Sequence, residues 1–385
     1  MNKKPKILIL ISTFFPARNG GGPVVSLLNF SKALKDVFDI YFISDHHDFG
    51  DSKPYSTVKE GWNKTNDYNI YYIPCRENSR KHINRVIDEI YPDVIYLNSI
   101  LDYHYSIPVL MNTNIKSKKI PLIISSRGEM CEGAFNIKKY KKLPYISILR
   151  FFGILKNANW HVTSEDEEEG IIKYINANKK QIFYAENIPT AFDINIFDKE
   201  KKVDSLNLVF VSRIQKKKNL YGAIKMLNKV KEIKVNFDIF GPMEDKDYWN
   251  RCEELIKNSP ENISVCYKGK LEHNEVESIL KKYHFFYMPT FSENYGHAIV
   301  ESMLCGTPVI ISDQTPWSDI NKFNAGFAIP LDYEDKYIET IEYLGKMNQK
   351  TYDEITKNCL EFIKKNANFK NSINDHKKMF FSLIK

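Results

Sequence analysis

Two glutamates eight positions apart, Glu293 and Glu301, occupy the stretch "FSENYGHAIVESMLCGTPVIISDQTPW". A strand is predicted to end at Pro289. The cap-type residues and Gly296 that follow predict a turn into a helix over 297–304. The first N–H groups of a helix are unpaired and attract anions. The stretch therefore predicts a site where a phosphate meets the helix start, with a carboxylate on either side.

Helical phase separates Glu301 from the apolar face of this predicted helix. That face consists of Ile299, Val300, Met303 and Leu304. At about 100° per residue, Glu301 points away from it, so Glu301 need not be buried by the core. There its carboxylate can accept hydrogen bonds from the vicinal hydroxyls of a sugar, while Glu293 reaches the group beyond the phosphates. A helix-cap glutamate beside a solvated one explains the same spacing, and the pattern alone leaves both interpretations open.

The stretch "FVSRIQKKKNL" supplies two cations. Arg213 follows a predicted strand, and Lys218 precedes a helix that starts near Asn219. At the carboxyl edge of one sheet, two fixed positive charges would neutralise a diphosphate and the charge that develops on it as a leaving group. The alternative is a solvated basic loop, because residues 216–218 are a run of lysines.

A glycine-rich loop, "NGGGPVVSLLNF", follows the first predicted strand. Gly21 and Gly22 permit a close backbone approach, and the next helix is expected to begin near Pro23. The loop suits a phosphate or an acceptor. Dinucleotide binding competes with this interpretation, because Asp45 ends the second predicted strand, where a ribose ligand would stand. However, the loop lacks the third glycine of G-x-G-x-x-G.

Short apolar runs that alternate with amphipathic stretches position these residues. In the first half the runs are "KILILIS", "FDIYFIS", "NIYYIP", "DVIYLN", "PLIISS" and "NWHVTS", starting at residues 6, 38, 69, 93, 121 and 159. In the second half they are "LNLVFVS", "VNFDIFG", "NISVCYK", "HFFYMP" and "TPVIIS", starting at residues 206, 235, 262, 284 and 307. Continuous apolar strands that alternate with helices predict parallel sheets covered on both faces.

The chain is predicted to form two domains. Residues 186–205 are polar, contain a proline and are weakly periodic, as in a hinge linker. We therefore predict an α/β fold of two doubly wound Rossmann-like domains facing a cleft, over residues 1–190 and 191–366. A final lysine-rich helix over about 367–385 can dock on either domain, and we expect it to pack back on the first.

The composition is that of an ordinary globular protein, with 385 residues, of which 43% are hydrophobic and 27% are charged. The net charge of +7 suits an acidic ligand or an anionic membrane surface. The six cysteines are scattered without metal-ligand or C-x-x-C spacing, which indicates reduced thiols in a cytoplasmic protein. No run approaches the roughly 18 apolar residues of a spanning helix, so any membrane contact is expected to be peripheral.

With these motifs together, the chain resembles the retaining GT-B glycosyltransferases of family 4. The resemblance is most specific in "PTFSENYGHAIVESMLCGTPVIISDQTPW". It also takes in "VSRIQKKKN", "FDIFGPMED", "ISSRGEM", "HVTSEDEEEGI" and the glycine loop, in the expected order over nearly the whole chain.

The resemblance implies an acceptor-binding first domain and a second domain that holds a nucleotide-diphospho-sugar, UDP- or GDP-linked, with no further cofactor. Arg213 and Lys218 would contact the diphosphate, and Glu301 the donor ribose. Glu293 would contact the transferred sugar and stabilise positive charge at its anomeric carbon. The remaining donor-binding positions it implies are Gly21, Gly22, Gly241, Gly269, Asn294, Tyr295, Gly296 and His297.

The resemblance also implies the mechanism. Retention in this family is usually explained by attack on the same face of the sugar, with the leaving phosphate taking the acceptor's proton, so no protein nucleophile or metal is required. Many relatives place a histidine near the reacting sugar. Here "ISSRGEM" puts Arg127 at that position, and we include it among the catalytic candidates.

The implied function is transfer of a hexose-type sugar to a glycan or lipid-linked acceptor in bacterial capsule, O-antigen or lipopolysaccharide synthesis. A catalytically silent GT-B scaffold, a sugar-nucleotide epimerase and an NAD-dependent enzyme are the alternatives. The basic residues form no nucleic-acid-binding signature.

Residues 136–156, "NIKKYKKLPYISILRFFGILK", interleave lysines and arginine with aromatic residues. Such a stretch suits anionic lipid headgroups at the inner face of the cytoplasmic membrane. An ordinary solvated helix face over a core explains the same pattern, and both interpretations stay open.

Overall fold

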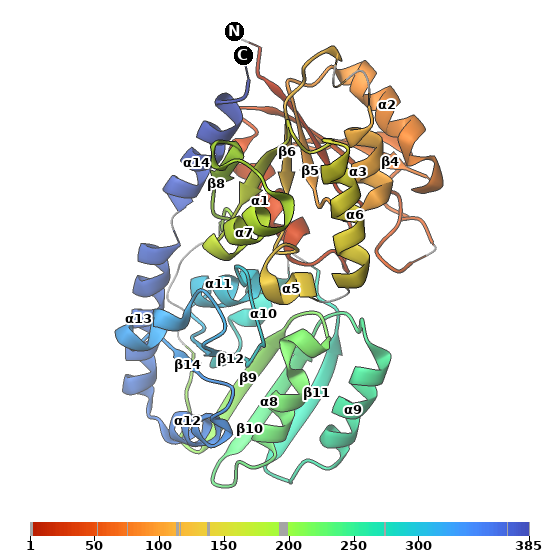
Figure 1. The fold of residues 1–385 in the computed structure, drawn as a ribbon. Coiled ribbons are helices and arrows are strands. Elements are labelled where there is room, and N and C mark those ends of the chain that lie inside the picture. Colours follow the sequence, from red (N-terminus) through yellow and green to blue (C-terminus); the bar gives the residue numbers. More distant parts are fainter. Residues whose placement is uncertain are drawn as a thin grey trace. The chain divides into compact units, whose positions relative to one another are not determined.

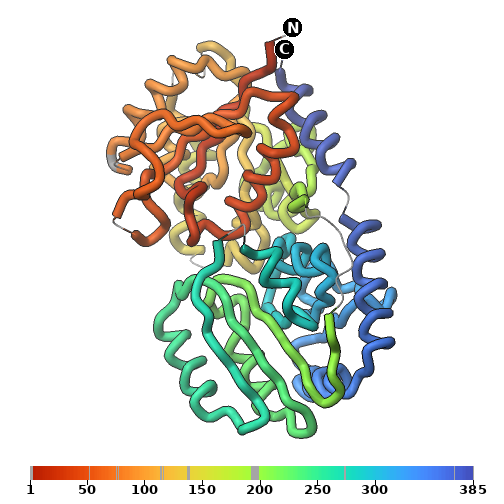
Figure 2. The backbone as a smooth tube through the Cα atoms, turned by 180° about the vertical axis from the view of Figure 1, so that it is seen from behind, coloured from red at the N-terminus to blue at the C-terminus, as the bar shows by residue number. Residues whose placement is uncertain are grey.

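The computed structural model describes residues 3–51, 53–74, 76–112, 115, 117–136, 139–191, 199–272, 275–367 and 369–384. The chain divides into two compact units: Met1–Ile188 with Phe369–Lys385 forms unit 1, and Pro189–Asn368 forms unit 2. Figures 1 and 2 show a central sheet flanked by helices in each unit. Residues 192–198 of the expected linker, 137–138 of the basic stretch and Cys75 lie outside the described residues.

Unit 1 contains an eight-stranded sheet in the order β3-β4-β2-β1-β5-β6-β7-β8. The strands are β1 Lys6–Leu10, β2 Asp39–Asp45, β3 Gly61–Lys64, β4 Asn69–Ile73, β5 Val94–Asn98, β6 Leu122–Ser125, β7 Asn159–Val162 and β8 Ile182–Tyr184. Every described pairing in this sheet is parallel except that of β3 with β4. Reversal of the strand order falls between β1 and β5.

Helices cover both faces of the unit 1 sheet. They are α1 Gly22–Leu34, α2 Ser79–Ile90, α3 Tyr103–Leu110, α5 Glu132–Asn136, α6 Lys139–Phe151, α7 Glu165–Gly170 and α14 Phe369–Phe381, with shorter turns η1 Arg76–Asn78, η2 Ile171–Ile175 and η3 Lys179–Gln181. Alternate residues of β1 enter opposite cores, Ile7 on one face and Leu8 on the other, as the two-residue period of a strand requires. Met379 and Phe380 of α14 belong to the same core as Ile7, so the C-terminal helix packs on unit 1.

Unit 2 contains six parallel strands in the order β11-β10-β9-β12-β13-β14. They are β9 Ser205–Val211, β10 Lys234–Phe240, β11 Ile263–Gly269, β12 Phe285–Met288, β13 Val309–Ser312 and β14 Phe327–Ile329. The helices are α8 Leu220–Leu227, α9 Lys246–Lys257, α10 Val276–Leu280, α11 His297–Leu304, α12 Glu334–Lys346 and α13 Gln349–Asn366, with turns η4 Lys216–Lys218 and η5 Ser318–Phe323. The strand order reverses between β9 and β12, the position where doubly wound sheets bind ligands.

The predicted fold class, two doubly wound sheets of parallel strands, is confirmed. All eleven apolar runs form strands. Ten of them lie inside a sheet, where strands buried on both faces need apolar residues throughout, and the eleventh, β11, lies at the edge of the unit 2 sheet. The prediction omitted β3, β8 and β14, which are short and lie at sheet edges. An edge strand pairs on one side only and needs fewer apolar residues, so its sequence pattern is weak. Within the described residues, no helix has both the length and the apolar character that crossing a bilayer requires.

Candidate functional site

The two loops at the switch point of unit 2 are joined by hydrogen bonds. One follows β9 and the other follows β12. The backbone N–H of Phe291 donates to the carbonyl of Lys217 over 2.9 Å, and the hydroxyl of Thr290 donates to the same oxygen over 3.0 Å. The side-chain amide of Asn219 donates to the carbonyl of Pro289 over 2.9 Å. Residues from distant parts of the sequence are therefore held at one edge of the sheet.

Lys218 and Glu293 form an ion pair across these two loops. Their side chains are only 12% and 9% exposed, so water screens this pair weakly. Asn219, in the left-handed region with φ of 54°, caps α8 by accepting from the N–H of Gly222 over 3.2 Å, and this turn orients Lys218. The sequence predicted both residues for the diphosphate and sugar region, and the structure brings them into direct contact.

Arg213 pairs with Glu244, with 2.9 Å between Nη1 and Oε1. Both side chains are partly exposed, and an ion pair of this kind contributes little to stability, so its arginine can turn to another anion at low cost. Glu244 was not singled out from the sequence, although it stands in the quoted motif "FDIFGPMED".

Gly241 and Gly269 lie at the same sheet edge as Arg213. The N–H of Gly241 donates to the carbonyl of Gly269 over 2.9 Å. Gly241 has φ of 141°, and a Cβ there would overlap the carbonyl of Ser212, so only glycine fits. A Cβ at Gly269 would meet no atom within 4 Å, so the space beside this residue is open.

The helix predicted over 297–304 is confirmed as α11. Gly296 precedes it with φ of 76°, and a Cβ there would lie 3.0 Å from the side chain of Ile299. The indole N–H of Trp317 donates to the carbonyl of Tyr295 over 2.6 Å, and the rings of Tyr295 and His297 lie 4.8 Å apart. Glu293 donates its backbone N–H to the carbonyl of Gln314 over 3.0 Å. These contacts fix residues on both sides of Asn294 in the turn before α11.

The sequence indicated that the core need not bury Glu301, but in the structure its side chain is buried, with 5% exposed. The hydroxyl of Thr190 donates to its carboxylate over 3.0 Å. Burial raises the pKa of Glu301 to about 7, and the Thr190 hydrogen bond opposes that shift. Helical phase predicted where Glu301 points but could not show that Thr190, from the first residues of unit 2, lies against it.

In unit 1, the glycine loop follows β1 at that sheet's own switch point. Gly21 has φ of 64° and precedes α1, and its carbonyl accepts from the N–H of Val24 over 3.1 Å. Gly22 is the first residue of the helix. Asp48, which the sequence did not reveal, accepts from the N–H groups of Arg18 and Asn19 over 2.7 and 3.2 Å and anchors the start of the loop.

Arg127 lies just after β6 with φ of 48°, an uncommon backbone conformation for a residue with a side chain. Its guanidinium donates over 2.6 Å to Asn98, over 3.0 Å to both Ser26 and Asn187, and over 3.2 Å to Tyr96. Arg127 therefore joins α1, the end of β5 and the last residues of unit 1 before the junction. These four bonds are structural contacts within unit 1.

Two further carboxylates hold the loop of Arg127, and both went unnoticed in the sequence. Glu167 is fully buried and accepts from Ser126 over 3.0 Å, from the N–H of Thr163 over 2.7 Å and from the N–H of Gly128. Glu129 accepts from the hydroxyl of Ser99 over 2.8 Å, and burial raises the pKa of Glu129 to about 7. The motif "HVTSEDEEEGI" carried the signal for Glu167, since an acid three residues after a helix cap often bonds back to the preceding backbone.

Asp45 does not support the dinucleotide alternative. Its carboxylate is buried, pairs with Arg76 over 2.5 Å and accepts from the hydroxyl of Tyr105 over 2.7 Å. Both oxygens are occupied inside unit 1, so Asp45 presents no free acceptor for a ribose.

The strand order and helices of unit 2 define an α/β domain of the doubly wound class, whose switch point is where such folds bind ligands. Residues 191–362 match the family of "Glycosyl transferases group 1", so unit 2 is a glycosyltransferase domain of group 1 type.

The chain is also similar to a curated sequence relative and to two solved structures. The chain is 28% identical over 150 residues to the uncharacterized glycosyltransferase MJ1178 of Methanocaldococcus jannaschii, which is 37% of this chain and 40% of the relative. The chain spans less than half the length of the curated relatives it matches.

Among solved structures, sucrose-phosphate synthase of Thermosynechococcus elongatus superposes with a TM-score of 0.74 at 14% identity, over 99% of each chain. Anabaena Alr3699/HepE in complex with UDP and glucose superposes with a TM-score of 0.69 at 14% identity, over 98% of this chain and 99% of that one. At these identities the similarity establishes the fold, which is that of GT-B glycosyltransferases.

Proposed function

We propose that this protein is a retaining glycosyltransferase that moves a hexose-type sugar from a nucleotide-diphospho-sugar to a glycan or lipid-linked acceptor. The observation that carries the proposal is the Lys218–Glu293 pair at the β9/β12 switch point of a domain that matches group 1 glycosyltransferases. The biological setting we propose is bacterial capsule, O-antigen or lipopolysaccharide synthesis at the cytoplasmic face of the membrane.

The proposed donor site follows from the charges at the switch point. Arg213 and Lys218 contact the diphosphate, and each exchanges a carboxylate partner for phosphate oxygens when the donor binds. Glu293 then faces the transferred sugar without its cation and stabilises positive charge at the anomeric carbon. The charge of the leaving diphosphate is thus met by side chains in this proposal, and not by a metal ion.

The rest of the donor is assigned to neighbouring groups in unit 2. Glu301 accepts hydrogen bonds from the ribose hydroxyls, and the backbone from Asn294 to His297 holds phosphate and sugar hydroxyls. The base lies near Gly241 and Gly269, where the open space beside Gly269 supports the assignment. The UDP in the Anabaena structure supports a UDP-linked donor here, and a GDP-linked donor is the alternative.

In the proposed reaction the bond between the anomeric carbon and the leaving phosphate oxygen breaks. The acceptor oxygen bonds to the same face of the carbon, and the acceptor's proton moves to the leaving phosphate. No protein nucleophile takes part, so catalysis depends on positioning and on charge. Unit 1 is assigned to the acceptor. Arg127 is assigned there as a positioning residue, because its four hydrogen bonds organise that unit.

A thermal-shift panel of UDP, GDP, ADP and NAD tests the proposal. We expect stabilisation by UDP or GDP and none by NAD, followed by slow hydrolysis of the matching nucleotide-sugar without acceptor. Stabilisation by NAD would overturn the proposal. Nucleotide binding without hydrolysis or transfer would favour a catalytically silent scaffold, and interconversion of the free sugar-nucleotide would favour an epimerase.

A further inference from the structure

The edge strand β11 of unit 2 is long and open. Edge strands are usually short or carry several charges, because their unpaired backbone groups pair readily with another chain. The other edge strands, β3, β8 and β14, have four, three and three residues, whereas β11 has seven and no proline. Its one charged residue, Lys268, is paired with Asp238 of the neighbouring strand, with 3.7 Å between Nζ and Oδ1. No strand among the described residues pairs with the outer side of β11.

Val265 and Tyr267 carry the outward-facing backbone groups of β11. The N–H of Val235 in β10 donates to the carbonyl of Asn262 over 2.9 Å. Residues of a parallel strand face their neighbour alternately, so the N–H and C=O groups of Val265 and Tyr267 point away from β10. The thiol of Cys266 contacts the carbonyl of Tyr267 over 3.9 Å, a weak contact that leaves the second lone pair of this oxygen free. The outer edge therefore offers two donors and two acceptors.

A second copy of β11, running antiparallel, satisfies all four groups in one register. When Val265 lies opposite Tyr267 of the other copy, each such pair exchanges two hydrogen bonds. The register in which Val265 faces itself would place Tyr267 opposite Ile263, whose N–H already donates to the carbonyl of Pro260 over 2.9 Å. The register in which Tyr267 faces itself would place Val265 opposite Gly269, where the pairing with β10 is irregular. The first register is therefore favoured.

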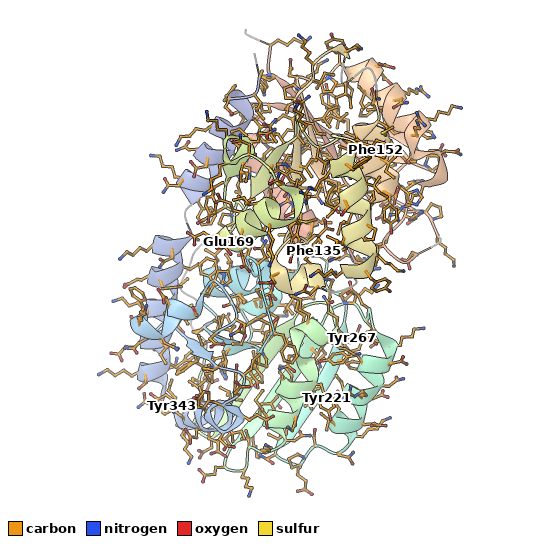
Figure 3. All side chains as sticks on the ribbon, viewed as in Figure 1. Phe135, Phe152, Glu169, Tyr221, Tyr267 and Tyr343 are labelled. Atoms are coloured by element: carbon orange, nitrogen blue, oxygen red, sulfur yellow. The ribbon has the colours of Figure 1, made fainter. Side chains whose placement is uncertain are left out.

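The side chains of β11 are self-complementary in the same register. On one face, the half-buried Val265 stands opposite the half-buried Tyr267, which Figure 3 labels, and a β-branched residue beside an aromatic one is a favourable cross-strand pair. Ser264, Cys266 and Lys268 are exposed on the other face. There Lys268 falls opposite the uncharged Ser264, and Cys266 falls opposite its own counterpart. No like charges meet along the strand.

We propose that two copies of the chain associate through β11, antiparallel about a two-fold axis at Cys266. The strand contact alone is small beside the roughly 1,200 Å² of a standard stable interface, so we expect weak, concentration-dependent association. Arg213 and Lys218, which the proposed function assigns to the donor, follow β9, two strands away from β11. The inference goes beyond the proposed function and does not rest on it.

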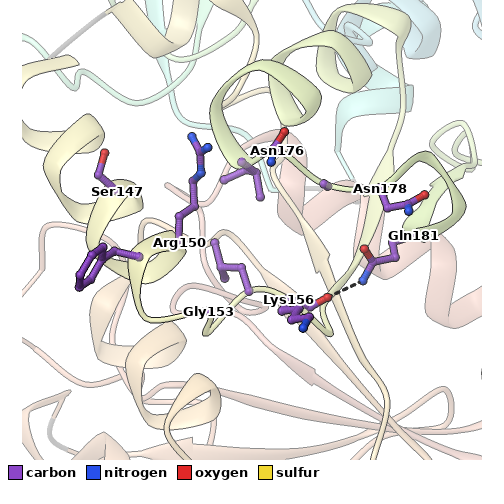
Figure 4. A pocket seen from close by; sticks show the side chains of 11 residues that line it. Ser147, Arg150, Gly153, Lys156, Asn176, Asn178 and Gln181 are labelled. Carbon is purple, nitrogen blue, oxygen red and sulfur yellow. Dashed lines mark hydrogen bonds between the residues drawn. The ribbon is translucent and has the colours of Figure 1, made fainter.

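An open depression on the surface of unit 1 is less suited to a second copy. It has a volume of about 810 Å³, and its lining includes Arg150, Phe151, Lys156 and Gln181 (Figure 4). A two-fold contact brings the same patch of both copies together, so Arg150 and Lys156 would face cations of the other copy. Like charges brought together in an interface oppose association. The contact is therefore assigned to β11.

Oxidative cross-linking tests the register. Opposed residues of a non-hydrogen-bonded pair have Cα atoms about 4.5 Å apart, within the range of roughly 4.4 to 6.8 Å that a disulfide spans. Copper phenanthroline should therefore convert the wild type rapidly to a covalent dimer through Cys266. Cys266→Ser should stay monomeric under the same treatment. Tyr184→Cys in the Cys266→Ser background is the matched control, because it puts an exposed thiol on the edge strand β8, and it should cross-link slowly.

A charge exchange at Cys266 tests the association without a covalent bond. Sedimentation equilibrium of the reduced wild type, from about 1 to 500 µM, should show a monomer–dimer equilibrium. Cys266→Lys and Cys266→Glu each place like charges opposite one another and should weaken the dimer at least about fivefold. An equimolar mixture of the two should recover it, because lysine then faces glutamate. Tyr184→Lys should associate as the wild type does, and all variants should keep the wild-type melting temperature.

The outcomes separate this inference from the proposed function. A wild type that stays monomeric throughout, a mixture that associates no better than the separate variants, or cross-linking that persists in Cys266→Ser would overturn the inference. Nucleotide binding by Cys266→Lys should equal that of the wild type. A β11 dimer that binds no nucleotide would leave the inference standing and remove the proposed function.

Discussion

The hydroxyl of Thr190 donates a hydrogen bond of 3.0 Å to the carboxylate of Glu301, although 111 positions separate the two residues. Thr190 is the second residue of unit 2, and Glu301 lies in α11. The bond orients a carboxylate whose pKa burial raises to about 7. The Thr190 bond fixes the orientation in which Glu301 accepts hydrogen bonds. Burial makes the ionised carboxylate less stable than it would be in water.

The first prediction concerns Glu301→Gln and the dependence of stability on pH. The pKa rises from an ordinary 4.5 to about 7 on folding, so between these values the folded state binds more protons than the unfolded state. Stability contributed by Glu301 is therefore full below about pH 4.5 and is lost as the pH rises to 7. The glutamine variant should be more stable than the wild type at pH 8, by on the order of 1 to 3 kcal/mol, and not at pH 4.5.

Urea unfolding at the two pH values measures this difference. The same variant should bind nucleoside diphosphate about tenfold more weakly, because it loses a charged acceptor for the ribose hydroxyls. If Glu301→Gln were less stable than the wild type at pH 8, burial of the ionised Glu301 carboxylate would not destabilise the folded state, and the prediction would be wrong.

A second prediction addresses Thr190→Val, which keeps the shape of the side chain and removes the donor. Loss of a hydrogen bond to the ionised form should raise the pKa of Glu301 further. The pH at which nucleotide affinity reaches half its maximum should move upward, while affinity at high pH stays near that of the wild type. Calorimetric titration with nucleotide at a series of pH values measures this midpoint. Glu301→Gln is the reference, because its side chain does not titrate and its affinity should show no such midpoint. A uniform loss of affinity at every pH would indicate a structural role only.

The third prediction concerns the Lys218–Glu293 pair. Lys218→Met leaves the largely buried carboxylate of Glu293 without its cation. Glu293→Gln leaves the largely buried ammonium of Lys218 without its anion. Each should lower the free energy of unfolding by about 3 kcal/mol. The double variant should recover much of that loss. Turnover should fall at least about a hundredfold in all three, since in the proposed mechanism both charges act on the transition state.

Lys225→Met provides the control, because Lys225 pairs with Glu334 on an exposed surface. It should change stability by less than about 1 kcal/mol and leave turnover unchanged. If Lys218→Met also left turnover unchanged, the pair would have no catalytic role.

The fourth prediction separates two roles for Arg127. Lysine keeps the charge but cannot reproduce a guanidinium that bonds Asn98, Ser26, Asn187 and Tyr96. As a positioning residue, Arg127→Lys should destabilise unit 1 by about 2 to 4 kcal/mol and lower turnover with it. Thermal unfolding monitored with and without nucleotide should place the loss in unit 1, since the proposed donor site lies in unit 2 and nucleotide is expected to stabilise that unit.

Arg80→Lys, at an exposed position of α2, is the comparison and should be close to neutral. An Arg127→Lys variant with wild-type stability and reduced turnover would instead favour direct contact with the sugar, and a changed KM for donor would support that contact.

How far the sequence alone predicts this protein can be judged from particular residues. Continuous apolar runs predicted the ten interior strands and the edge strand β11, and the glycine before His297 predicted where α11 begins, because both depend on neighbours in the chain. The placement of Arg213 and Lys218 after one strand and Glu293 after another also followed from local pattern together with the rule for parallel sheets. The short edge strands, with only one pairing partner each, escaped this reasoning.

The sequence by itself determined the order of strands and helices and the residue types at each strand end, since backbone propensity and burial on two faces act locally. Only the tertiary structure decided which charges are paired and which side chains are buried. Glu301 is buried against Thr190, Lys218 is neutralised by Glu293, and Arg127 is held by Ser26 and Asn187. Hydrogen bonding and desolvation depend on atoms a few ångströms away in space, and folding brings those atoms together from positions far apart in the chain.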